Sequence, residues 1–90
     1  MIKAVISVVG HDKVGIIAKV SALLAEHNVN VLDISQTVMQ GYFTMIMLVD
    51  VEKLDIKFGD FADLMSSFGD TIDMNIRVQH EDIFNSMHRI

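Results

Sequence analysis

A change of hydrophobic period around residues 10–15 constrains the fold of this chain more than any other feature. Over residues 2–9, apolar side chains fill every second position on one side, which is the period of a β-strand. Over residues 16–27 the period becomes three or four residues, which indicates an amphipathic helix. The chain therefore starts with a strand, a short loop bounded by Gly10 and Gly15, and a helix.

Two further strands follow this helix. Asn28 is a suitable helix stop, and residues 29–38 predict a strand because β-branched side chains are frequent among them. Gly41 marks a turn, and residues 42–51 predict a third strand that is apolar on both sides. A strand covered on both faces usually lies in the middle of a sheet. Its apolar side chains divide into Phe43, Met45, Met47, Val49 and Val51 on one face and Ile46 and Leu48 on the other.

A second helix, a fourth strand and a tail complete the pattern. The helix has Asp55 as a candidate N-cap and Gly69 as a candidate stop. Residues 71–79 alternate between apolar and polar side chains and predict the fourth strand, and residues 80–90 predict a short amphipathic helix. The apolar positions are Phe58, Phe61, Leu64, Met65 and Phe68 in the helix, Ile72, Met74, Ile76 and Val78 in the strand, and Ile83, Phe84, Met87 and Ile90 in the tail.

This order of elements predicts an α+β fold, a ferredoxin-like βαββαβ sandwich. Its four-stranded antiparallel sheet carries both main helices on one face, and a short C-terminal helix follows. A chain of 90 residues has the length of one compact unit, so we expect a single domain over 1–90, with the core at 1–79 and the tail helix at 80–90.

The second face of the sheet needs a cover. The third strand is apolar on that face too. In the second strand, apolar residues stand at both odd and even positions, and so on both faces: Val31, Leu32 and Ile34. Apolar residues make up 51% of the chain, which is more apolar surface than a small monomer easily hides. We expect another subunit or the tail helix to cover this face, and a homodimer is the simplest arrangement.

Composition narrows the partners and the compartment. The chain has no cysteine, which removes disulfides and thiol chemistry and fits a cytoplasmic location. No secretory signal and no membrane span is expected. Twelve acidic residues against seven scattered basic ones give a net charge of −5, which disfavours nucleic acid as a partner.

The loop between the first strand and the first helix is the best candidate for a binding site. A helix start has backbone N–H groups without helical partners and a partial positive charge, so it attracts anions. Gly10 allows a turn with positive φ, and Gly15 leaves the amides unshielded. A structural explanation is equally open: Asp12 caps the helix, Gly10 serves the turn, and Gly15 allows close packing.

Two segments of the sequence resemble the ACT domain, a regulatory module of amino-acid metabolism. They are Gly10-His11-Asp12-Lys13-Val14-Gly15-Ile16-Ile17-Ala18-Lys19-Val20 and Asn28-Val29-Asn30-Val31-Leu32-Asp33-Ile34-Ser35-Gln36. The likeness extends over the whole chain, and the ending with a tail helix resembles the stand-alone ACT proteins of bacteria and archaea. The ACT part of formyltetrahydrofolate deformylase and the glycine cleavage transcriptional repressor have similar loops.

The resemblance implies a ligand site where the loop of one subunit meets the second strand of its partner. The implied ligand-binding residues are Gly10, His11, Asp12, Val14, Gly15 and Ile16 from the loop, Asn30 from the start of the second strand, and more weakly Ser35 and Gln36. The amino-acid-sensing branch commonly has asparagine at the Asp12 position and proline at the Val14 position. A carboxylate at Asp12 would repel a ligand carboxylate and attract an amine.

No catalytic or metal chemistry is expected. The four histidines do not pair with other ligands at metal-binding spacing, and no nucleophile lies beside a base. We therefore expect no cofactor and no enzymatic activity. The expected function is a regulatory domain that binds an amino acid or related metabolite and acts on an unidentified enzyme or regulator. The alternative is a ligand-free protein–protein interaction module.

Overall fold

Four strands form a single antiparallel sheet in the computed structural model, which describes residues 1–11 and 13–82. The elements are β1 (Lys3–His11), α1 (Ile16–Glu26), β2 (Asn30–Met39), β3 (Tyr42–Asp50), α2 (Phe58–Thr71) and β4 (Met74–His80). The predicted βαββαβ order is therefore confirmed. Residues 83–90 of the predicted tail helix lie outside the described residues.

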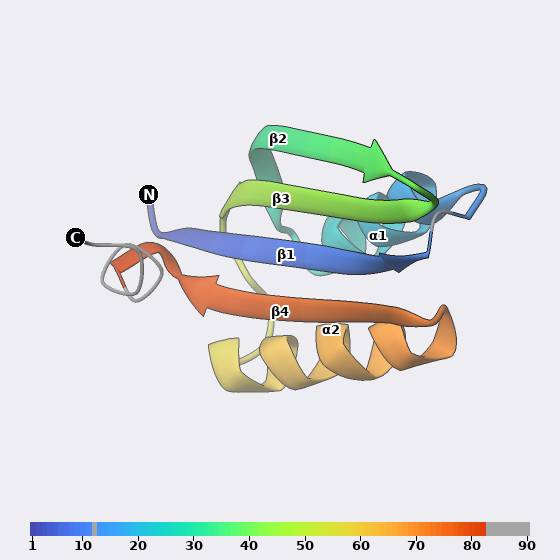
Figure 1. The fold of residues 1–90 in the computed structure, drawn as a ribbon. Coiled ribbons are helices and arrows are strands. Elements are labelled where there is room, and N and C mark those ends of the chain that lie inside the picture. The colour runs from blue at the N-terminus through green and yellow to red at the C-terminus, as the bar shows by residue number, and fades with distance from the viewer. Residues whose placement is uncertain (12, 83–90) are drawn as a thin grey trace.

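The two central strands are β1 and β3. The strand order is β2-β3-β1-β4, with β1 paired antiparallel to both β3 and β4 (Figure 1). The prediction that the third strand is central is confirmed. Both edges of the sheet are formed by the strands that follow a helix, β2 and β4.

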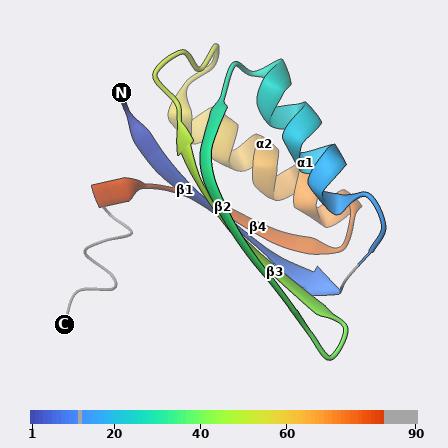
Figure 2. The ribbon, with the colours of Figure 1, turned by 90° about the horizontal axis from the view of Figure 1, so that it is seen from above.

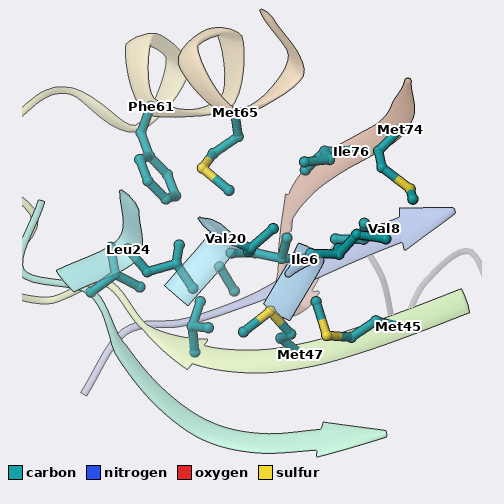
Figure 3. Packing of buried hydrophobic residues seen from close by; sticks show 14 of the residues in the cluster. Ile6, Val8, Val20, Leu24, Met45, Met47, Phe61, Met65, Met74 and Ile76 are labelled. Carbon is teal, nitrogen blue, oxygen red and sulfur yellow. The ribbon is translucent and has the colours of Figure 1, made fainter. Parts of the chain in front are cut away.

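Both helices pack on the same face of the sheet (Figure 2). The strand residues that face them alternate along the chain as the sequence predicts, and Figure 3 shows how they meet the helix side chains. At most 1% of each of the following residues is exposed: Ala4, Ile6, Val8, Val20, Leu24, Met45, Met47, Val49, Phe61 and Met65. Among the described residues no polar or charged residue is buried, so this core is held together by apolar contacts alone.

The prediction for the second helix is wrong at both ends. Asp55 does not cap it: the N-cap is Lys57, and the Asp55 carboxylate lies 2.8 Å from Nδ1 of His27 at the end of α1. Gly69 does not stop it, since α2 continues to Thr71. A Cβ at Gly69 would lie 2.5 Å from the carbonyl oxygen of Met74, so glycine is needed there for close approach of the helix to β4.

The second strand contains a β-bulge that explains its apolar pattern. Val31 pairs with Val49 and Asp33 pairs with Leu48, which leaves Leu32 as the extra residue. The bulge shifts the phase, so Val31 and Ile34 face the same side of the sheet although their parities differ. Apolar residues at both odd and even positions of this strand therefore do not by themselves indicate that both faces of the sheet are covered.

The hairpin between β2 and β3 has a two-residue turn. Gln40 has φ 52° and Gly41 has φ 81°, and the flanking Met39 and Tyr42 pair with each other. Positive φ at both turn residues is typical of the tight turn that matches the twist of an antiparallel hairpin. The turn predicted at Gly41 is confirmed.

Neither of the two described helices has the length and apolar character needed to cross a bilayer.

Candidate functional site

The N-cap residue of α1 has no side chain that could cap the helix. Gly15 occupies the N-cap position with φ 84° and ψ 8°, and the first turn contains no acidic residue. The N–H of Lys19 donates to the carbonyl oxygen of Gly15 at 3.0 Å, so helical hydrogen bonding begins there. The amides of the three preceding helix residues therefore have no partner within the helix. The left-handed φ explains why a glycine stands at this position.

A pocket of about 250 Å³ lies beside these amides, and we call it the loop pocket. It is formed where the start of α1 faces the second half of β2. Its lining residues are Lys13, Gly15, Ile16, Ile17, Ala18, Gln36, Val38 and Phe43. Drug-sized ligands occupy pockets of about 300–1,000 Å³, so the loop pocket has the size for a smaller metabolite.

The loop pocket has both polar and apolar lining residues. The start of α1 and Lys13, whose ammonium is paired with Asp73, lie on one side, and Gln36 lies on the β2 side. Val38 and the buried Phe43 supply an apolar wall. Such a combination can hold a small molecule with an anionic group at one end and an apolar part at the other.

Three of the residues implied by the resemblance line this pocket: Gly15, Ile16 and Gln36. Val14 is fully exposed beside it, and Asp12 lies outside the described residues. The other lining residues were not among the ligand-binding residues implied by the sequence: Lys13, Ile17, Ala18, Val38 and Phe43. One available signal was that Val38 follows Gln36 by two residues on the same strand and so shares its face.

Gly10 and His11 belong to β1 rather than to the loop. Gly10 does not have positive φ, so the turn role expected for it is wrong. A Cβ at Gly10 would lie 2.5 Å from Sδ of Met74, so glycine allows close packing against β4. The His11 ring stacks on Tyr42, with 4.8 Å between ring centroids.

Asn30 and Ser35 do not reach the loop pocket of their own chain. Asn30 starts β2 opposite Asp50, at the end of the sheet away from the loop (Figure 1). Gln36, the first β2 residue that lines the loop pocket, is six positions further along, a rise of about 20 Å along an extended strand. Ser35 pairs with Ile46 and lies on the sheet face opposite the helices.

Lys13 ties the loop to the turn before β4. Its Nζ lies 2.9 Å from Oδ2 of Asp73, and this hydrogen bond holds the pKa of the Asp73 carboxyl below its usual value. Asp73 itself has φ 56°. A residue that lines the pocket is thus attached through a salt bridge to the far edge of the sheet.

Within residues 1–11 and 13–82, no three His, Asp or Glu side chains are close enough together to hold a metal ion.

Comparison with known proteins agrees with this architecture. The ACT domain family model matches residues 3–79. A UPF0237 protein of Bifidobacterium longum is 54% identical over 90 residues, with complete coverage of both chains.

Solved structures place the same fold in several proteins. An ACT domain protein from Streptococcus pneumoniae has a TM-score of 0.81 and 42% identity, with 92% of this chain and 93% of that chain covered. A formyltetrahydrofolate deformylase from Pseudomonas syringae has a TM-score of 0.80 and 26% identity over 88% of this chain and 27% of the enzyme. A putative glycine cleavage system transcriptional repressor shares the fold at 22% identity and a TM-score of 0.73, over 87% of this chain and 44% of that one. By its sequence and its fold, the chain belongs to the ACT domain family.

Proposed function

We propose that this protein is a small-molecule-sensing regulatory domain that binds an amino acid or a related carboxylate metabolite in the loop pocket. The observation that carries the proposal is the glycine N-cap of α1 beside Gln36, facing the apolar wall of Val38 and Phe43. Membership of a family found in regulatory proteins supports a sensing function in general.

The ligand carboxylate would accept hydrogen bonds from the first amides of α1. The helix dipole favours negative charge there, and no carboxylate of the first turn competes for the position. An amino acid has about seven to ten heavy atoms, and each contributes at most about 1.5 kcal/mol. We therefore expect micromolar to millimolar affinity, which suits an abundant metabolite.

The site would be completed by a second copy of the chain. Every residue of the edge strand β2 except Val31 is exposed, and no other strand of residues 1–11 and 13–82 pairs with its outer edge, so a strand of a second copy could pair there. Antiparallel pairing of two β2 strands places the beginning of one strand beside the end of the other. Asn30 of the partner subunit would then lie near the loop pocket, which Asn30 of the same chain does not reach.

The protein would act on an enzyme or regulator rather than catalyse a reaction itself. Ligand binding at the junction of two subunits changes the stability of the pair, and a bound partner can respond to that change. The competing hypothesis is a ligand-free interaction module, in which Gly15 serves only the start of the helix.

Thermal unfolding in the presence of each of the twenty amino acids and of related monocarboxylates tests the proposal. We expect at least one compound to raise the Tm of the wild type, and we expect Gly15→Val to lose this rise. Gly41→Val is the matched control, because Gly41 also has φ above 80° and open space around it but does not line the pocket. A folded dimer that responds to none of these compounds would favour the ligand-free module.

A further inference from the structure

A groove separate from the loop pocket lies between the two helices, on the outer side of the helix layer. Its volume is about 470 Å³, and we call it the helix groove. It is lined by Leu23 of α1 and by Asp60, Asp63, Leu64, Ser67, Phe68 and Thr71 of α2. It shares no lining residue with the loop pocket, and Figure 2 shows the two helices that form it on the same side of the sheet.

The floor of the helix groove is apolar and firmly supported. Leu23, Leu64 and Phe68 are only partly buried, and all three pack against the hydrophobic core. Leu64 and Phe68 are one helical turn apart on α2, so they form one apolar strip opposite Leu23. A groove held in shape by the core needs little reordering when a partner binds, which reduces the entropic cost of docking.

The rim of the helix groove is acidic. Asp60 and Asp63 line it, both are exposed, and neither forms an ion pair with another residue of the described part of the chain. The α2 sequence contains a third acidic residue, Asp70, and no lysine or arginine. The basic residue on α1, Lys19, is one turn before Leu23 and does not line the groove.

We propose that the helix groove docks an amphipathic helix of a partner protein whose apolar stripe is flanked by lysine or arginine. The apolar strip would receive the stripe, and Asp60 and Asp63 would pair with the basic residues. Asp60 and Thr71 are eleven residues apart on α2, a rise of about 17 Å, so the groove accommodates about three turns of a docked helix.

Two other occupants fit the charges less well. A second copy of this chain would bring its own α2, which has no basic residue, and the chain as a whole carries a net charge of −5. An anionic membrane surface would be repelled by Asp60 and Asp63. The groove would thus provide an output surface for a regulatory domain, and it does so whether or not the loop pocket binds a ligand.

Binding of a synthetic helical peptide tests the proposal. The probe is a labelled amphipathic peptide of leucine and lysine, and the control peptide has glutamate in place of every lysine. We expect the basic peptide to bind the full chain with micromolar affinity in fluorescence anisotropy. We expect amide chemical-shift changes to concentrate in α1 and α2 and to leave the sheet face opposite the helices unchanged.

Two matched pairs of variants separate docking in the groove from general charge attraction. Ser66 and Ser67 are both exposed neighbours on α2, but only Ser67 lines the groove. Ser67→Arg should therefore weaken binding of the basic peptide about tenfold, by filling the groove and repelling the peptide, and Ser66→Arg by less than about twofold. Likewise Asp63→Lys should weaken binding about threefold to tenfold, against less than about twofold for Asp70→Lys outside the groove.

Three results would overturn the proposal. Equal weakening within each pair would mean that only the net charge matters. Equal affinity for the two peptides would remove the role of the acidic rim. Shift changes confined to the β1, β3 and β4 amides would place the peptide on the sheet face opposite the helices. Circular dichroism of all four variants checks that each is folded before binding is compared.

Discussion

At the scale of single residues, the glycines have different reasons for being glycine. Gly15 has positive φ and open space around it, and Gly10 has a neighbouring strand too close for a Cβ. The first reason is conformational and the second is steric. The two glycines that bound the predicted loop therefore respond differently to substitution.

Gly15→Ala should lower the free energy of unfolding by about 1–2 kcal/mol, because an L-residue is strained at this φ. Gly59→Ala is the control, since Gly59 lies in the first turn of α2 with negative φ and open space. It should be neutral or stabilise the protein by about 0.4–1 kcal/mol. Urea denaturation measures both, and the same change in the two variants would contradict the assignment of strain to Gly15.

Lys13→Met should raise the pKa of the Asp73 carboxyl toward its usual value, because Lys13 provides the hydrogen bond and the positive charge that lower it. The pKa of Asp50 is also lowered, chiefly by the backbone N–H of Glu52, and should not change. Titration followed by carbon NMR of the carboxyl groups measures both. An unchanged Asp73 pKa would mean that the salt bridge does not form in solution.

The sign of the corresponding pH dependence follows from the lowered pKa. A carboxyl with a depressed folded-state pKa stabilises the protein at neutral pH, and this contribution is lost as the pH falls below about 3.9 and through the folded-state value. Wild type and Lys13→Met should therefore differ in stability at neutral pH and converge in acid.

At the scale of elements, the close contact between α2 and β4 leaves no room for a side chain at Gly69. Gly69→Ala should lower the free energy of unfolding by about 1–3 kcal/mol, because its Cβ would meet the backbone oxygen of Met74. Ser66→Ala, at an exposed position of the same helix, should change stability by less than about 1 kcal/mol. Chemical denaturation of both variants tests this, and a stabilising Gly69→Ala would show that the helix does not approach β4 so closely.

At the scale of the whole molecule, the proposed ligand site takes its loop from one subunit and Asn30 from the other. A complementation experiment follows. Gly15→Val homodimers and Asn30→Ala homodimers should each lose most ligand binding. Each heterodimer formed by mixing them contains one junction with both wild-type residues and one with neither. Random mixing of equal amounts makes about half of the dimers heterodimers, so it should restore about a quarter of the ligand sites of the wild type.

Calorimetry with the ligand found by thermal unfolding measures this recovery. Sedimentation equilibrium on the 10.1 kDa chain confirms that each sample is dimeric. If mixing restores nothing while heterodimers are present, the site lies within one chain, and Asn30 does not contribute across the pair.

The periodicity of the sequence by itself determined the element order, the central position of the third strand and the inward faces of β1, β3 and β4. These features depend on local repeats of two or about 3.6 residues, and such repeats are visible in a linear chain. The tight turn at Gly41 was equally predictable, because the φ preference of glycine is a local property.

Only the tertiary structure decided which residues meet. Gly69 reads as a helix stop, yet it is a helix residue that β4 approaches closely, and Asp55 reads as a cap, yet it contacts His27. The bulge at Leu32, the salt bridge from Lys13 to Asp73 and the apolar wall of the loop pocket likewise bring together residues from different elements. The physical reason is that local preferences act over one turn or one strand pair, whereas these contacts depend on how the packed layers align.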